Sequence, residues 1–178
     1  STPAAAAPPP AASAPAAAPP PAATPAPAAK QQAVALPPDV VRAVESATAF
    51  ADDTATQSQH MNALRVLSQE PFASAADFAT MDAKVKLHAM AGQLEETRAA
   101  LRVLRENHSK DLGTDVLKLH DYVMERFHAS PMVLKERACA REAVGDLEGA
   151  CTDLEQAIRQ DPESGDRDRL EKLYRRRA

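Results

Sequence analysis

The pentapeptide Ala-Leu-Arg-Val-Leu occurs twice in this chain, at residues 63–67 and again at residues 100–104. Each copy is followed by a polar stretch that ends a helix: Ser-Gln-Glu-Pro-Phe after the first and Arg-Glu-Asn-His-Ser after the second. The offset of 37 residues falls in the range of helix-turn-helix repeats. Chance recurrence of common residues is the alternative, but the matching context on both sides favours a structural unit that is used more than once.

The pattern beyond Pro38 is helical throughout. Apolar residues recur at three- and four-residue spacing, and no stretch alternates with the period of two of a half-buried strand. Glycine and proline mark the turns. The expected helices span about 39–50, 58–69, 74–90, 94–106, 114–127, 131–143, 147–161 and 164–177, with Ser74 and Thr114 as N-caps. Eight short helices with tight turns predict an all-α array of antiparallel helical hairpins.

The segment before these helices has a different composition. The first 29 residues contain only Ala, Pro, Ser and Thr. Such a segment buries too little apolar surface to offset chain entropy, and its prolines lack the N–H that a helix needs. We interpret residues 1–37 as a disordered Ala/Pro-rich tether and residues 38–178 as the folded domain. A tether after a first residue other than Met is typical of a processed, exported or organelle-imported protein, although a trimmed chain would look the same.

The charge balance restricts the kind of partner. The net charge is −4 and the pI is about 5.7, which argues against nucleic acid, and the only basic run is 175–177 at the end of the chain. No stretch approaches the roughly 18 apolar residues of a transmembrane helix. We therefore expect a protein partner or a multi-subunit complex, with the tether linking the domain to a membrane or a larger assembly.

No motif for catalysis, a cofactor or a metal is present. The chain has no H-E-x-x-H, no G-x-S-x-G and no phosphate-binding glycine loop. His120, Met124 and His128 share one helix face, which we interpret as solvated because no second element supplies ligands. Cys139 and Cys151 lie on two arms of one expected hairpin and are predicted to be reduced and unbridged. The chain is therefore expected not to be an enzyme.

Residues 131–164 contain the clearest repeat. A turn at Gly145 is followed by small, large, small and proline residues at the spacing A-x3-L-x2-A-x4-P. This segment resembles one tetratricopeptide repeat (TPR), a helix-turn-helix unit of about 34 residues. Small residues let the two helices approach closely, while leucines fill the space around them. The matching positions are Leu134, Ala138, Gly145, Leu147, Ala150, Leu154, Ala157 and Pro162.

Other parts of the chain depart from the family pattern. Arg137 and Arg141 stand where the family has a leucine and an aromatic residue. The hairpin of residues 78–107 fits loosely, and the 53 residues from Gly92 to Gly145 do not match a period of about 34. The helix over 114–127 is therefore extra or belongs to a repeat of another size. The resemblance implies a TPR-like α-solenoid with a C-terminal capping helix over residues 165–177.

The resemblance also implies a working surface. TPR proteins usually bind a peptide or a partner helix on the concave face, which the first helix of each pair lines. Here Lys135, Cys139 and Glu142 form an i, i+4, i+7 stripe on that helix and are the candidate partner-binding residues. Cys139 stands where carboxylate-clamp members have asparagine, which argues against binding of a chaperone tail.

Three functions remain open on this evidence. The first is a non-catalytic protein–protein interaction scaffold or adaptor, tethered by the Ala/Pro-rich linker. The second is a structural accessory subunit that is permanently integrated in a large envelope or organellar complex. The third is an accessory domain separated from an enzyme.

Overall fold

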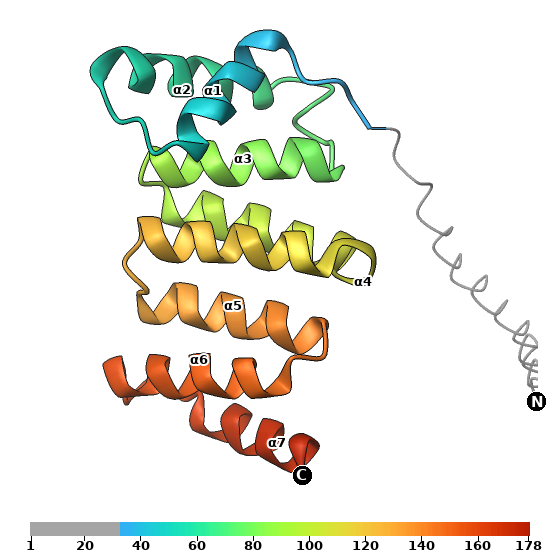
Figure 1. Cartoon of the computed structure of the whole chain (residues 1–178), viewed down its shortest axis with the longest axis vertical. Coiled ribbons are helices and arrows are strands. Elements are labelled where there is room, and N and C mark those ends of the chain that lie inside the picture. The colour runs from blue at the N-terminus through green and yellow to red at the C-terminus, as the bar shows by residue number, and fades with distance from the viewer. Residues whose placement is uncertain (1–32) are drawn as a thin grey trace, which may run out of the picture.

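The computed structural model describes residues 33–178, and all regular structure in this part is helical (Figure 1). No strand occurs among these residues, which confirms the all-α prediction. The helices are α1 (Pro38–Thr48), α2 (Thr54–Leu67), α3 (Phe78–Met90), α4 (Leu94–Arg126), α5 (Pro131–Ala143), α6 (Leu147–Gln160) and α7 (Arg167–Arg177).

Helix α4 doubles back on itself. It has 33 residues, of which Leu112 alone is non-helical (φ −126°, ψ 31°). A straight helix of that length would separate its ends by about 50 Å. The guanidinium of Arg126, at the C-terminal end, nevertheless donates a hydrogen bond at 3.2 Å to the carbonyl of Ala89, just before α4 begins. The chain therefore reverses at Leu112 (Figure 1), and we name residues 94–111 the first arm and residues 113–126 the second arm.

The two helices predicted over 94–106 and 114–127 correspond to these arms, which the non-helical Leu112 separates, and the first arm is longer than predicted. Thr114 is not an N-cap because it lies within helical backbone. The reversal is tight at Gly113, where an added Cβ would lie 2.5 Å from Cγ1 of Val144. Any side chain at this position would force the Val144 side chain to shift, so the close approach favours glycine here.

Helix α3 begins later than predicted. The sequence placed its N-cap at Ser74, but the cap is Asp77, whose carboxylate accepts a hydrogen bond from the Thr80 N–H at 3.0 Å. Residues 68–77 form turns, within which the Ser74 hydroxyl donates to the Glu70 carboxylate at 2.6 Å. Serine often satisfies its hydroxyl within a turn, and that local bond competes with helix capping.

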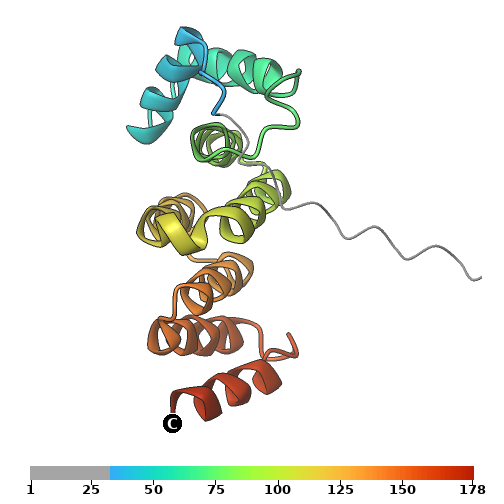
Figure 2. The ribbon, with the colours of Figure 1, turned by 90° about the vertical axis from the view of Figure 1, so that its right-hand side faces the viewer.

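The helices lie one beneath another along the long axis, from α1 and α2 at one end to α7 at the other (Figures 1 and 2). Three clusters of buried apolar side chains join them, at α1–α3, at α3–α5 and at α5–α7. The chain has four phenylalanines, two tyrosines and no tryptophan. The clusters are accordingly built mainly from leucine, valine, alanine and methionine, with short side chains where helices approach closely.

Two side chains before α1 pack against the core. Val34 and Leu36 are half-buried and lie against the α1–α3 cluster. Residues 1–32 of the predicted tether lie outside the described residues, and the boundary at residue 37 stays a prediction.

Two histidines are buried inside the domain. The prediction that His120 faces solvent is wrong: its side chain is fully buried, and Nδ1 lies 2.8 Å from the Val116 carbonyl oxygen. His60 is also buried, with Nε2 2.8 Å from the Ser46 hydroxyl. Burial lowers the pKa of both imidazoles below the ordinary value, because desolvation disfavours the charged form. His128, by contrast, is exposed.

This burial predicts a loss of stability in mild acid. The unfolded histidines titrate near pH 6.5, and the folded ones titrate lower, so the unfolded state binds more protons as the pH falls below about 6.5. We expect full stability well above that pH and a progressive fall in the melting temperature as the pH drops from about 6.5 to about 5.5. The variants His60→Gln and His120→Gln should each flatten this profile. An identical slope in all three proteins would contradict the assignment.

Candidate functional site

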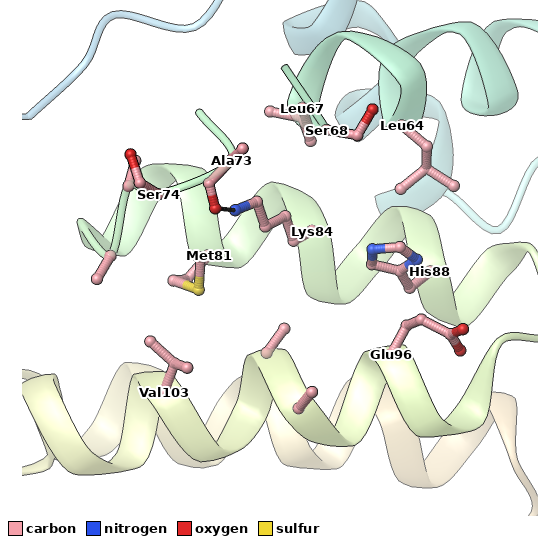
Figure 3. Close-up of a pocket in the computed structure, with 14 residues that line it drawn as sticks. Leu64, Leu67, Ser68, Ala73, Ser74, Met81, Lys84, His88, Glu96 and Val103 are labelled. Carbon is pink, nitrogen blue, oxygen red and sulfur yellow. Dashed lines mark hydrogen bonds between the residues drawn. The ribbon is translucent and has the colours of Figure 1, made fainter. Parts of the chain in front are cut away.

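A groove of about 540 Å³ opens between α2, the turn segment 68–77, α3 and the first arm of α4 (Figure 3). We name it the α2–α4 groove. Its walls are mostly apolar, and alanines make up much of them. The lining residues are Leu64, Leu67, Ser68, Ala73, Ser74, Ala75, Ala76, Met81, Lys84, His88, Glu96, Ala99, Ala100 and Val103.

The repeated pentapeptide forms two walls of this groove. Leu64 and Leu67 come from the first copy on α2, and Ala100 and Val103 come from the second copy on α4. In both copies the alanine and the two leucines are buried, the arginine is exposed and the valine is half-buried. The two copies therefore present equivalent faces to the interior, with α3 between the helices that carry them.

Lys84 closes the groove on the side of the turn segment. Its ammonium group donates a hydrogen bond to the carbonyl of Ala73 at 3.2 Å (Figure 3). It donates a second one to the carbonyl of Phe72 at 2.7 Å. Burial lowers the pKa of Lys84, although the negative charges of Asp77 and Glu70 act in the opposite direction. The lysine thus fastens residues 68–77 to α3 and keeps the groove in shape.

The other polar groups gather at one end of the groove, where Figure 3 shows His88 and Glu96 near each other. His88 Nδ1 lies 2.6 Å from Oε1 of Gln93, which accepts its hydrogen bond. The Glu96 carboxylate is exposed and has neither a hydrogen bond nor an ion pair with any residue among 33–178. An apolar groove with one unpaired carboxylate at its end fits an apolar side chain with a cation beside it.

The predicted stripe of Lys135, Cys139 and Glu142 lies together on α5 but faces the C-terminal segment. Lys135 Nζ lies 2.7 Å from Oδ2 of Asp166. Glu142 forms ion pairs with Arg169, at 3.1 Å, and with Arg176. Cys139 is half-buried. Their role in binding a partner stays a prediction, and the sequence analysis missed that α7, which begins at Arg167 rather than at residue 164, reaches these side chains.

The charges around Glu142 stabilise its ionised form. Burial by itself would raise the pKa of this carboxyl, but hydrogen bonds from Arg169 and Arg176 lower it overall. One feature of the sequence could have indicated the contact between α5 and α7, namely the spacing of opposite charges. Asp166, Arg169 and Arg176 share one helix face, and the stripe on α5 carries a lysine and a glutamate of opposite charge. Complementary spacing on two helices does not by itself show that they are neighbours.

The hairpin of residues 131–164 buries several small and leucine side chains between its helices. Helices α5 and α6 pack against each other, and Gly145 turns the chain between them with a φ of +86°, a conformation that favours glycine. Pro131 occupies the first turn of α5, as expected. The side chains that are fully buried are Leu134, Ala138, Ala150, Leu154 and Ala157.

The two arginines that depart from the family pattern, Arg137 and Arg141, both form ion pairs with one buried aspartate. The guanidinium of Arg137 binds both oxygens of Asp153, at 2.7 and 3.0 Å, and Nη1 of Arg141 lies 3.2 Å from Oδ2. Arg137 also reaches the exposed Asp121 at 2.7 Å. We name Arg137, Arg141 and Asp153 the α5–α6 ion cluster. The cluster explains how two arginines occupy positions that are apolar in the family.

The two cysteines are free, as predicted. Cys151 is buried, and desolvation raises the pKa of its thiol. A buried thiol with a raised pKa is a poor nucleophile and acts as a small packing residue.

Comparison with known proteins found no family model, no curated protein and no solved structure that matches the chain. Among residues 33–178, no helix combines the length and the apolar composition needed to cross a membrane. Within the same residues, no group of three or more histidine, cysteine or acidic side chains is arranged to hold a metal ion.

Proposed function

We propose that this chain is a non-catalytic protein-interaction scaffold whose helices form a TPR-like α-solenoid. The observation that carries the proposal is the α2–α4 groove, with apolar walls, a volume of about 540 Å³ and few polar groups. Grooves of this kind take the apolar side chains of a peptide or a partner helix, and a small number of polar groups fix its orientation.

Two further features support the solenoid part of the proposal. The two Ala-Leu-Arg-Val-Leu copies bury the same positions on α2 and α4. The α5–α6 hairpin buries the residues that hold a TPR unit together. Units that present the same packing face can stack and bury one continuous core. In this proposal the Ala/Pro-rich residues 1–32 act as the linker, because their composition is that of a spacer.

The distribution of exposed apolar side chains favours an exchangeable scaffold over a permanently buried subunit. Among the described residues, the large apolar side chains that are exposed are Val41, Met61, Met132 and Tyr174. They come from α1, α2, α5 and α7, respectively. Permanent interfaces are usually broad and apolar, whereas single exposed apolar residues are ordinary on a free surface.

Groove blocking tests the proposal. Ala99 is an exposed alanine on the rim, and Ala99→Trp should place an indole over the opening while changing stability by less than about 0.5 kcal/mol. We expect partners captured by the full chain from native lysate to be lost with this variant. The matched control is Ala55→Trp, at an exposed helical alanine outside the groove, which should retain them. Capture of every partner at full yield by Ala99→Trp would refute the proposal for this groove.

A further inference from the structure

Helix α7 covers an apolar face that α5 and α6 build together. The floor of this face consists of Ala138, Ala150, Cys151 and Leu154, and Leu173 of α7 packs onto it. We name these four floor residues with Lys135 and Glu142 the α5–α6 face. The floor residues belong to two helices, α5 and α6, that also pack directly against each other. Removal of α7 would therefore leave a preformed apolar surface between two charged side chains.

The charged rim matches one stripe of α7. Asp166 pairs with Lys135, and both Arg169 and Arg176 pair with Glu142. With Leu173 between the arginines, the contacting residues fall at i, i+3, i+7 and i+10, which is one face of a helix. The α5–α6 face thus recognises a short pattern: an acid, an arginine, a leucine and a second arginine.

Two leucines provide the apolar contacts that hold α7: Leu173 is its only buried residue, and the half-buried Leu170 packs against the same cluster. Its other side-chain contacts are polar or charged, and Asp166 makes no side-chain capping hydrogen bond. The ion pairs to Lys135 and Glu142 are partly exposed, so dissolved salt screens them. A helix of 11 residues is marginal in isolation. Helix α7 should therefore open more readily than α5 or α6, whose buried contacts are more numerous.

We propose that the α5–α6 face is a docking surface for a partner helix with this acid–arginine–leucine–arginine pattern, and that α7 is the internal occupant which such a helix replaces. The surface is separate from the α2–α4 groove, so the inference does not depend on that groove. It does assign a role to Lys135 and Glu142: they hold α7 when the surface is free of a partner and hold the partner helix when α7 is displaced.

A peptide with the sequence of residues 161–178 provides the probe. It carries a fluorescent label, and its binding to the full chain is followed by anisotropy at low and high salt. In the full chain, Leu173→Ala weakens the anchor of α7 without altering the α5–α6 face. The apparent dissociation constant falls as the fraction of open molecules rises, so this variant should bind the peptide roughly tenfold or more tightly than the unmodified chain. Added salt should weaken the binding.

Two controls distinguish specific docking from nonspecific binding of the peptide. Adding Glu142→Lys to the Leu173→Ala chain should abolish binding, because it repels both arginines of the peptide. A peptide that itself carries Leu173→Ala should fail to bind the opened chain. The proposal is wrong if the Leu173→Ala chain, folded by circular dichroism, binds no better than the unmodified chain, or if Glu142→Lys has no effect.

Hydrogen exchange on the unmodified chain gives a test that needs no variant. Amides of α7 should exchange at least several-fold faster than amides of α6, and the difference should grow with salt. Equal protection of the two helices at every salt concentration would show that α7 is a fixed part of the core and would also overturn the proposal.

Discussion

Replacing Asp153 by alanine should lower the free energy of unfolding by about 3–5 kcal/mol, the usual effect of removing one partner from a buried ion pair. The Asp153 side chain is 1% exposed, and those of Arg137 and Arg141 are 16% and 24% exposed. Without the carboxylate, two guanidinium groups remain close together and poorly hydrated, and only the more exposed Asp121 and Asp146 are left as counter-charges. Urea unfolding monitored by circular dichroism measures the loss.

Asp121→Ala is the matched control for this variant. It removes the other carboxylate that Arg137 contacts, but the Asp121 side chain is 60% exposed. Exposed ion pairs contribute roughly 0–1 kcal/mol, so this change should be small. A loss no larger for Asp153→Ala than for Asp121→Ala would contradict the role assigned to the α5–α6 ion cluster.

An apolar replacement of the whole cluster should behave differently. In the triple variant Arg137→Leu, Arg141→Tyr and Asp153→Leu, no buried charge is left without a partner, because Asp121 and Asp146, which lose theirs, are exposed to solvent. Well-packed apolar groups in place of a buried ion cluster are often neutral or stabilising by about 1–4 kcal/mol. We expect the triple variant to be far more stable than Asp153→Ala alone. A triple variant as unstable as the single one would mean that the site cannot be packed with apolar side chains.

The helical class of this chain could be predicted because local patterns determine it. Apolar spacing, prolines in first turns and glycines at turns act within a few residues of each other. The α5–α6 hairpin is the clearest case: Pro131 opens one helix, Gly145 turns the chain, and Leu134 and Leu154 pack between the arms. None of these features depends on distant parts of the chain.

The errors arose where the outcome depends on contacts between distant residues. The close approach of Gly113 to Val144, more than 30 residues away in the chain, has no local pattern that would predict it. His120 was interpreted as one member of a solvated row, yet its side chain is fully buried. From the sequence, Asp153 is an ordinary charged residue of α6, because its pairing with the two arginines of α5 is visible only in the structure.

The candidate surfaces were predictable only in part. The repeated pentapeptide identified two helices that line the α2–α4 groove, but its depth depends on the turn segment 68–77 and on Lys84, which no periodic pattern marks. The spacing of Lys135, Cys139 and Glu142 indicated that they share one face of α5. The sequence did not indicate that α7 contacts this face, because the charges of α7 are also typical of an ordinary solvated helix.

Leu154→Ala should destabilise the domain by about 2–5 kcal/mol, the range for truncation of a fully buried leucine. The Leu154 side chain is 0% exposed and lies in the α5–α7 cluster. Its small neighbours Ala138 and Ala150 cannot extend into the space that it leaves, so most of the cavity should persist. This places the expected loss in the upper part of the range. Leu154→Met, which nearly preserves the volume, should lose less than about 1.5 kcal/mol.

Leu154→Ala also distinguishes a rigid core from a displaceable α7. Leu154 and Leu173 pack in one cluster, so the effects of the two truncations on the free energy of unfolding should not be additive. Once Leu173→Ala has loosened α7, Leu154→Ala should lower the free energy of unfolding by less than it does alone. Met61→Ala, at a side chain that is 53% exposed, gives the baseline and should change stability by less than about 0.5 kcal/mol. Strict additivity of the two leucine truncations in urea unfolding would show that α7 and α6 do not share a cluster in solution. A loss for Leu154→Ala no larger than that for Met61→Ala would mean that the α5–α7 cluster is not packed as described.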